Sequence, residues 1–277
     1  PTLKYKYKLS KLRTICSTGS PLSNEGFKYV YENIKKNVHL SSISGGTDIV
    51  SCFVLGNLYQ PVILGEIQNK GLGLDVNIFN EKGKPLKDKK GELVCRNPFP
   101  SMPLKFWNDK NDIKFKNAYF NNFLNTWYHG DYAEIKKGGG FIIHGRSDTT
   151  LNPGGVRLGT AEIYSEVEKF IEIKESIVVG QAWDNDVRII LFIVLNPKYA
   201  VNEDLLKKIR IQIRKNASPR HVPSKILVVD DIPRTKNGKI VELAVKNTIE
   251  GNKIKNKEAL ANPQVLEQYK NLKELNY

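Results

Sequence analysis

The stretch that most constrains the fold of this chain is GRSDTTLNPGGVRLG, residues 145–159, which lies just past its middle. It holds two arginines, an aspartate, a proline and four glycines, between the apolar run 141–143 and a predicted helix start at Thr160. Glycine adopts backbone conformations closed to other residues, and proline interrupts regular elements. We therefore interpret the stretch as a boundary between two folded parts, with the backbone freedom that a hinge needs.

The part before this boundary divides into two regions. Residues 1–60 show an α/β pattern, in which a helix predicted over 22–36 precedes HLSSISGGTDIVSCFVLG. Residues 61–147 are rich in strands and turns: LDVNIFNEKGKPL alternates with period two, GELVCR is a strand candidate, and KKGGGFIIHG predicts a hairpin. A small barrel or sandwich fits this second region.

The part after the boundary, residues 148–277, alternates helices with strands. Apolar periodicity predicts helices over 162–170, 203–215 and 240–250, and strands over 177–181, 187–195 and 225–229. Such an order is typical of a compact α+β module.

Composition narrows the possible partners. Among 277 residues, 43 Lys and Arg exceed 29 Asp and Glu, so the formal net charge is +14. A basic chain can bind polyanions, but the lysines are scattered and no arginine-rich tract interleaves with aromatic residues. We favour a solvated lysine surface with no specific nucleic-acid partner; a nucleic-acid-binding protein remains a rival interpretation.

The cysteines and the apolar runs point to a reducing, aqueous compartment. Cys16, Cys52 and Cys95 are far apart and lack metal-ligand spacing, so we expect free thiols, no zinc site and a cytoplasmic location. The longest apolar run, residues 49–58, is too short to span a membrane, and no signal peptide is visible. The chain opens on Pro1 and reads from there as the middle of a domain, so we expect that an N-terminal portion is missing.

Three short segments carry groups suited to a nucleotide. Gly45–Asp48 places a hydroxyl beside a carboxylate, as a phosphate oxygen and Mg²⁺ require, although such a loop can be an ordinary turn. Asp131 follows a glycine among aromatic residues, where it could bind ribose hydroxyls or cap a turn. Lys239 follows Asn237-Gly238 and is either a charge for an anionic reaction centre or a solvated lysine.

The order of the motifs resembles that of the adenylate-forming enzymes, which include acyl-CoA synthetases, nonribosomal peptide adenylation domains and luciferases. TGSPLS, GGTDI, YHGDY, GRSDTTLNPGGVRLGTAEIY and PRTKNGK are similar in turn to the adenine loop, threonine loop, ribose motif, hinge motif and C-terminal lysine loop of that superfamily. A chance match of all five in order is improbable. The resemblance implies the end of a large α/β domain, a small β-barrel-like subdomain and a mobile α+β C-terminal domain.

Within that superfamily the chain most resembles the acetoacetyl-CoA synthetase family, through SISGGTDIVSCFV, GELVCRNPFPSMPLKFWND and SPRHVPS. The resemblance implies ATP-dependent ligation of acetoacetate to coenzyme A through an acyl-adenylate, with Mg²⁺, releasing AMP and pyrophosphate. Acetyl-CoA synthetases have an acyl-pocket tryptophan where this chain has Gly45. Gly45 and Gly46 are therefore expected to leave room for a longer acid.

The resemblance also implies roles at the nucleotide. Gly19, Ser20 and Pro21 would line the adenine, with Ser20 in place of the family's usual glutamate. Thr47 would bind the α-phosphate as a catalytic residue. Asp48 would hold Mg²⁺, directly or through water.

Further implied roles concern the ribose, the hinge and the thiol. Asp131 would take the ribose hydroxyls and Arg146 the ribose or a phosphate. Asp148 would be the hinge, Gly155 would line the coenzyme A tunnel, and Arg157 would approach the phosphate during thioester formation.

Lys239 would be the adenylation lysine, because it and Mg²⁺ would offset the negative charge that builds on the α-phosphate. A C-terminal domain that turns about Asp148 would then move Lys239 away from the reaction centre and let the coenzyme A thiol enter. Acetylation of Lys239 by a lysine acetyltransferase would remove the charge that adenylation uses.

Three expectations limit these implications. The family's phosphate-gripping loop lies upstream of the motifs present here, so this piece alone is predicted not to complete adenylation. A catalytically silent family member is one alternative. A synthetase of another short acid, such as a propionate-like acid, is the other.

Overall fold

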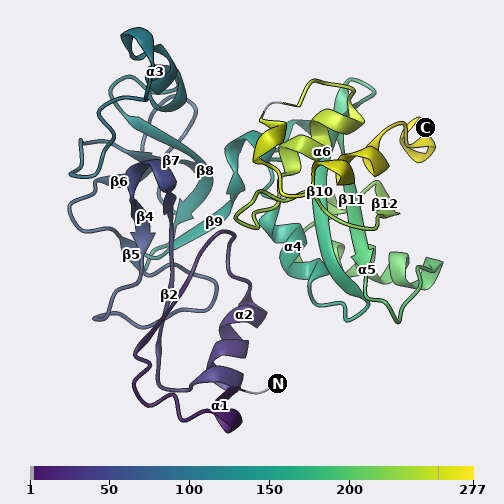
Figure 1. Cartoon of the computed structure of the whole chain (residues 1–277), viewed down its shortest axis with the longest axis horizontal. Helices are drawn as coiled ribbons and strands as arrows, with labels where there is room; N and C mark the ends of the chain where they lie inside the picture. Colours follow the sequence, from purple (N-terminus) through teal and green to yellow (C-terminus); the bar gives the residue numbers. More distant parts are fainter. Residues whose placement is uncertain (1–2, 255) are drawn as a thin grey trace. The chain divides into compact units, whose positions relative to one another are not determined.

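The computed structural model describes residues 3–254 and 256–277, and the chain separates between Ser147 and Asp148 into two units (Figure 1). The separation falls inside the glycine-rich stretch 145–159. The first unit is Pro1–Ser147 and the second is Asp148–Tyr277.

The first unit begins with a parallel pair of strands. After helix α1 (Leu3–Lys6), β1 (Thr14–Ser17) pairs with β2 (His39–Ser42), and helix α2 (Asn24–Tyr29) continues into a π-helical turn (Val30–Ile34) between them. The helix predicted over 22–36 is therefore confirmed as two joined pieces. It covers the parallel pair, because Phe27 and Val30 of the helix form a buried cluster with Val38 and Leu40.

The rest of the first unit consists of antiparallel sheets. One has the order β3 (Ser44–Gly46), β4 (Ser51–Leu55) and β5 (Asn69–Lys70), and a 3₁₀ turn (Thr47–Ile49) joins its first two strands. The other is a meander of β6 (Val76–Phe79), β7 (Gly91–Cys95), β8 (Trp127–Ile135) and β9 (Phe141–Arg146). A 3₁₀ turn (Lys110–Asp112) and α3 (Ile113–Tyr119) lie between β7 and β8.

The strands expected from LDVNIFNEKGKPL and GELVCR and the hairpin expected from KKGGGFIIHG are confirmed as β6, β7 and β8–β9. In the described residues these strands form open sheets and no closed barrel. An isolated antiparallel bridge, Ile67 with Phe141, joins the segment before β5 to β9. Side chains of the two sheets also share one core, in which Phe53 packs against Trp127.

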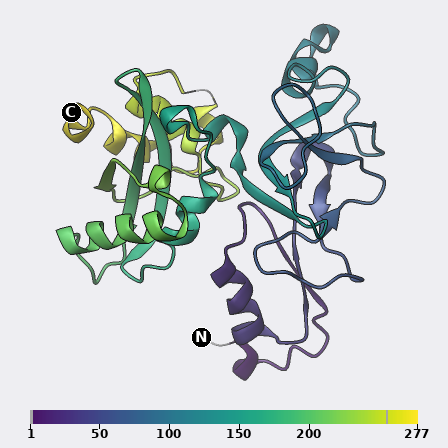
Figure 2. The same cartoon turned by 180° about the vertical axis from the view of Figure 1, so that it is seen from behind.

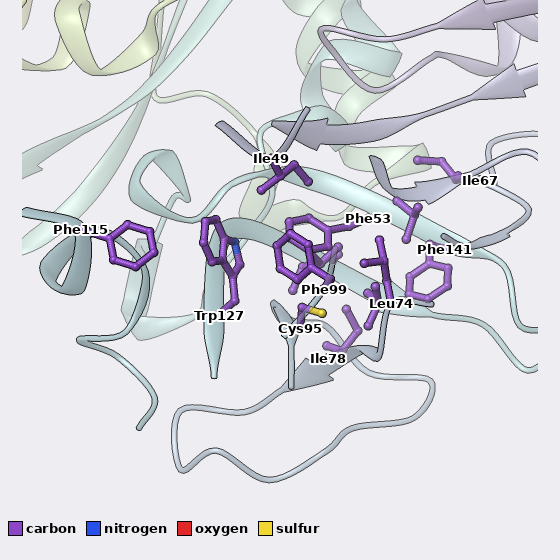
Figure 3. Close-up of a cluster of buried hydrophobic side chains, with 14 residues drawn as sticks. Ile49, Phe53, Ile67, Leu74, Ile78, Cys95, Phe99, Phe115, Trp127 and Phe141 are labelled. Atoms are coloured by element: carbon purple, nitrogen blue, oxygen red, sulfur yellow. The ribbon is translucent and has the colours of Figure 1, made fainter. Parts of the chain in front are cut away.

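Aromatic side chains dominate the core of the first unit. Figure 3 shows Trp127 between Phe115 on one side and Phe53 and Phe99 on the other. The Trp127 side chain is 1% exposed, and its ring stacks on Tyr119 with centroids 3.7 Å apart. This core fixes the strand that carries Asp131.

The second unit is a three-stranded sheet covered on both faces (Figure 2). Strands β10 (Ile173–Trp183) and β11 (Asp186–Leu195) are antiparallel, and β12 (Lys225–Val228) runs parallel to β11. The helices are α4 (Ala161–Val167), α5 (Glu203–Asn216) and α6 (Glu242–Ile249). Short 3₁₀ turns occupy Ser147–Thr149, Pro153–Gly155, Pro219–His221, Lys257–Ala259, Pro263–Tyr269 and Lys273–Leu275.

The apolar run in β11 serves two cores because successive side chains point to opposite faces of a strand. Ile189, Leu191 and Ile193 pack with α4 and α5. Ile190, Phe192 and Val194 pack with α6 and the segment after it. A two-residue turn, Asp184 (φ 48°) and Asn185 (φ 59°), closes the β10–β11 hairpin with the positive φ angles of a type I′ turn.

The helices and strands expected in residues 148–277 are confirmed, with ends displaced by a few residues. Periodicity did not predict the three 3₁₀ turns after residue 256, because their apolar side chains follow neither helical nor strand spacing. Within residues 3–254 and 256–277, no helix has the length and apolar character needed to cross a membrane.

Candidate functional site

Two groups of candidate residues follow the carboxyl ends of the parallel strands β1 and β2. Ser17 pairs with Ser42, and the N–H of Ile43 donates to the Ser17 carbonyl at 2.9 Å. Both strands therefore end at one edge, where Gly19–Pro21 follows β1 and Ser44–Asp48 follows β2. In open α/β sheets, ligands bind beyond this edge.

Asp131 and Arg146 form an ion pair across the β8–β9 hairpin. Nη1 of Arg146 lies 3.0 Å from Oδ1 of Asp131 and donates to the His129 carbonyl at 3.1 Å. The Asp131 side chain is 8% exposed and that of Arg146 is 51% exposed. Ser44 Oγ donates to Oδ2 of Asp131 at 3.4 Å, which connects the aspartate to the segment that leads to Thr47.

Gly130 explains why a glycine precedes Asp131. Its φ is +79°, and a Cβ there would lie 2.7 Å from Nη2 of Arg146. A side chain at this position would therefore displace the guanidinium group from the carboxylate that it pairs with.

His129 connects the glycine loop to the same aspartate. Its Nε2 lies 3.1 Å from the Gly45 carbonyl and 3.7 Å from Oδ2 of Asp131, and its ring packs edge-on against Phe53. Burial lowers the pKa of His129 more than the nearby carboxylate raises it, so the neutral ring donates from Nε2 to Gly45. Among the described residues, the buried Nδ1 has no hydrogen-bond partner.

Tyr119, at the end of α3, donates its hydroxyl to Oδ2 of Asp48. Burial, together with this bond, raises the pKa of Tyr119 well above its ordinary value, so the hydroxyl stays a donor. Asp48 and the neighbouring Thr47 are exposed. The bond therefore fixes one carboxylate oxygen and leaves the other available.

The residues present fit a Mg²⁺ ion that arrives with a nucleotide. Among the described residues, no three His, Cys, Asp or Glu side chains gather as a metal cage. Mg²⁺ is commonly held by one or two carboxylates together with substrate phosphates. Asp48, exposed beside the Thr47 hydroxyl, offers that kind of site.

Close packing within the protein is by itself a reason for glycine at positions 45 and 46, besides any need for room for an acyl group. A Cβ at Gly45 would lie 2.2 Å from the Ser51 carbonyl oxygen, and one at Gly46 would lie 2.9 Å from Cε1 of His129. The approach of β3 to β4 therefore requires glycine at position 45. The role of both glycines in an acyl pocket stays a prediction.

Gly19, Ser20 and Pro21 lie exposed in the turn after β1. Gly19 has φ +99°, and a Cβ there would meet no atom within 4 Å. The backbone thus favours glycine at position 19, and the contact of these residues with adenine stays a prediction.

In the second unit, the glycine-rich loop is closed by its own backbone. Leu151 and Leu158 exchange hydrogen bonds of 3.0 and 2.7 Å, and Arg157 Nε donates to Thr150 Oγ1 at 3.0 Å. Gly155 has φ +71°, and a Cβ there would meet no atom within 4 Å. The surface beside Gly155 is therefore open in this unit.

Asp148 is the first residue of the second unit. Its role as the hinge stays a prediction, as do the roles of Gly155 and Arg157.

Lys239 lies on an exposed hairpin of the second unit. The N–H of Thr235 donates to the Lys239 carbonyl at 2.8 Å, and the N–H of Lys239 donates to Thr235 Oγ1 at 3.1 Å. Gly238, with φ +81°, forms the tip. Within the described part of the chain, the Lys239 ammonium group makes no ion pair or hydrogen bond, so the hairpin presents a charge to solvent.

Ser44, His129 and Tyr119 are site residues that sequence reasoning missed. His129 could have been found, since it lies two residues before Asp131 on a strand and so faces the same side. Tyr119 carried no local signal, because 71 residues separate it from Asp48.

A family model described as the AMP-binding enzyme C-terminal domain matches residues 162–239. The match lies within the second unit, so that unit resembles the C-terminal domain of AMP-binding enzymes. The chain is 59% identical to an acetoacetyl-coenzyme A synthetase of Rhizobium meliloti (strain 1021) over 96% of its length, and 49% identical to that of Gallus gallus over 97%. The chain is thus similar, over nearly its whole length, to part of the acetoacetyl-CoA synthetases.

A solved structure of an acetoacetyl-CoA synthetase from Streptomyces lividans matches 99% of the chain with a TM-score of 0.90 and 38% identity. The chain spans 41% of the length of each of the two curated relatives and 42% of the solved one.

Proposed function

We propose that the protein containing this chain ligates acetoacetate to coenzyme A, using ATP and an acyl-adenylate intermediate, and releases AMP and pyrophosphate. One observation carries the proposal: the buried Asp131 carboxylate, paired with Arg146, lies beside the segment that bears Thr47 and Asp48. The similarity to acetoacetyl-CoA synthetases supports acetoacetate as the acid.

In the adenylation step, a substrate carboxylate oxygen attacks the α-phosphorus and pyrophosphate leaves. Asp131 accepts hydrogen bonds from the ribose hydroxyls, and Thr47 donates its hydroxyl to an α-phosphate oxygen. Asp48, oriented by Tyr119, would hold Mg²⁺, which would neutralise phosphate charge when bound. Lys239 supplies a further positive charge to the transition state.

In the second step, the coenzyme A thiol attacks the acyl carbonyl, and AMP leaves as the thioester forms. We assign residues 1–60 to the end of the nucleotide-binding subdomain, 61–147 to a β-rich subdomain and 148–277 to a mobile domain. The separation of the chain at Asp148 supports a hinge there. Rotation about it would withdraw Lys239 and bring Gly155 and Arg157 toward the thiol path and the phosphate.

The test is acid-dependent ATP–pyrophosphate exchange by the complete protein with acetoacetate, acetate, propionate and butyrate. Exchange strongest with acetoacetate and lost in Lys239→Ala supports the proposal. Exchange strongest with propionate would make propionate the proposed substrate and leave the proposed reaction unchanged. No exchange with any of the four acids would contradict the proposed reaction and favour a catalytically silent member.

Two accompanying proposals concern regulation and location. A lysine acetyltransferase could reach the exposed Lys239, and the acetyl-lysine mimic Lys239→Gln should then abolish exchange. Unpaired cysteines Cys16, Cys52 and Cys95 support a reducing, cytoplasmic location. Fluorescence microscopy of the tagged complete protein tests the proposed location.

A further inference from the structure

The segment after α6, residues 256–277 (the C-terminal segment), is packed onto the sheet of the second unit. It contains three short 3₁₀ turns. Four buried side chains hold it on the face that α6 also covers: Leu260, Leu266, Tyr269 and Leu275. Because its side chains fix this segment, its backbone can position the parts of the chain to which it hydrogen-bonds.

What its backbone touches is the hairpin that bears Lys239. Leu260 forms an antiparallel bridge with Thr235. The N–H of Lys236 donates to the Ala259 carbonyl at 3.2 Å, and the N–H of Ala261 donates to the Arg234 carbonyl at 2.8 Å. Residues 259–261 thus pair with the arm of the hairpin that leads to Lys239.

The Asn262 side chain completes this attachment with both ends of its amide. Its Oδ1 accepts the N–H of Arg234 at 2.9 Å. Its Nδ2 donates to Oδ2 of Asp231 at 2.8 Å and to the Ile232 carbonyl at 3.0 Å. Asn262 therefore binds the entry to the hairpin at three places.

The entry itself is anchored from the same segment. Tyr269 Oη and Gln268 Nε2 each donate to the Asp231 carbonyl at 2.9 Å. Further along, the buried Arg188 of β11 donates to the main-chain oxygens of Leu275 and Tyr277 at 2.6 and 2.8 Å. The base of the hairpin is thereby tied to the core, whereas a Cβ at its tip, Gly238, would meet no atom within 4 Å.

We infer that the C-terminal segment sets the position of the Lys239 hairpin, with Asn262 as a positioning residue for adenylation. The inference rests on the proposed role of Lys239. The tip of the hairpin has no support of its own, so the position of the Lys239 ammonium group depends on the hairpin base. A displacement of a catalytic group by about 1 Å can lower the rate by about 10²-fold. Thioester formation does not use Lys239, so it should not depend on Asn262.

The experiment measures the two half-reactions of the complete protein separately. Asn262→Ala should lower kcat for acetoacetate-dependent ATP–pyrophosphate exchange by about 10-fold or more while KM for acetoacetate changes less than about twofold. Thioester formation from supplied acetoacetyl-adenylate and coenzyme A should keep its rate. Asn252→Ala is the matched control, because Asn252 bonds only to Glu250 through its side chain among the described residues, away from the hairpin.

A charge-exchanged pair tests positioning against mere loss of stability. Asn262→Asp alone puts a carboxylate against Asp231 and should impair exchange, and the added change Asp231→Asn should restore much of it by reversing the donor and the acceptor. The inference would be overturned if Asn262→Ala lost the rates of both half-reactions equally and in proportion to its loss of thermal stability. It would also be overturned if Asn262→Ala kept the full rate of ATP–pyrophosphate exchange while Lys239→Ala lost it. If Lys239→Ala retains exchange, the proposed role of Lys239 fails first and the inference fails with it.

Discussion

Asp131 and Arg146 lie directly opposite each other in the β8–β9 register, and their side chains meet at 3.0 Å. The two residues come from consecutive strands of one hairpin, so the pair follows from the pairing of those two strands. The same carboxylate also accepts a hydrogen bond from the hydroxyl of Ser44 in β3. The Asp131 carboxylate of the β8–β9 hairpin therefore lies beside the segment of the other sheet that leads to Thr47.

We expect Asp131→Asn to weaken binding of MgATP to the complete protein by about 10-fold or more, because hydrogen bonds to a charged group contribute about 1.5–3 kcal/mol. Isothermal titration calorimetry measures the affinity. Asp75→Asn is the control, since Asp75 pairs with Arg96 at 2.8 Å elsewhere in the same unit. A similar loss of affinity in both variants would argue against a nucleotide contact at Asp131.

His129 should make stability depend on pH. Burial lowers its native pKa below its unfolded value, so the unfolded state binds more protons and the free energy of unfolding falls as pH drops below about 6.5. The fall ends below the native pKa. His129→Gln should lack this share of the dependence in urea titrations at about pH 7.5 and about pH 5.5, whereas His39→Gln should retain it. An unchanged pH profile in His129→Gln would assign the dependence to other groups.

Tyr119→Phe removes the hydroxyl that orients Asp48 and keeps the ring that stacks on Trp127. One hydrogen bond of about 1 kcal/mol corresponds to about a fivefold rise in the Mg²⁺ concentration needed for half-maximal ATP binding. Calorimetric titration at several Mg²⁺ concentrations measures this, alongside exchange activity. Tyr59→Phe, at a position 97% exposed, should change neither. A Mg²⁺ requirement unaffected by Tyr119→Phe would exclude this positioning role.

Arg188→Ala should destabilise the protein by about 3 kcal/mol, because it removes a buried guanidinium group that donates to the main-chain oxygens of Leu275 and Tyr277 and leaves the buried Leu275 carbonyl without its donor. Chemical denaturation measures the free energy of unfolding. Lys208→Ala, which removes an exposed ion pair with Asp204, should produce no measurable change. Equal stability of the two variants would show that the clamp on the C-terminal segment is dispensable.

Gly45→Ala should destabilise the protein by about 1–3 kcal/mol, the usual cost of an overpacked position, because its Cβ would meet Ser51 at 2.2 Å. Gly138→Ala is the control, since a Cβ there meets nothing within 4 Å and the change should stay within about 0.5 kcal/mol. Thermal and urea unfolding of both variants provide the comparison. Full stability of Gly45→Ala would leave acyl-pocket size as the better explanation of this glycine.

Local patterns were sufficient for much of the fold and part of the site. Apolar period two located β11, helical spacing located α5, and a glycine turn predicted the hairpin that brings Arg146 to Asp131. These features depend on residues close in sequence, whose backbone geometry is set by neighbouring side chains. The order of the five motifs identified the enzyme class for the same reason, since each motif is itself a short segment.

The sequence by itself therefore determined the elements, the candidate charges and their order. Only the tertiary structure decided which charges meet: Tyr119 reaches Asp48, and Asn262 binds the base of the Lys239 hairpin. The physical reason is that contacts between distant residues depend on how whole sheets and helices pack, and no local periodicity encodes that packing. The open sheets, in a region where the sequence fitted a small barrel or a sandwich, have the same origin, because closure depends on strand pairing across the unit.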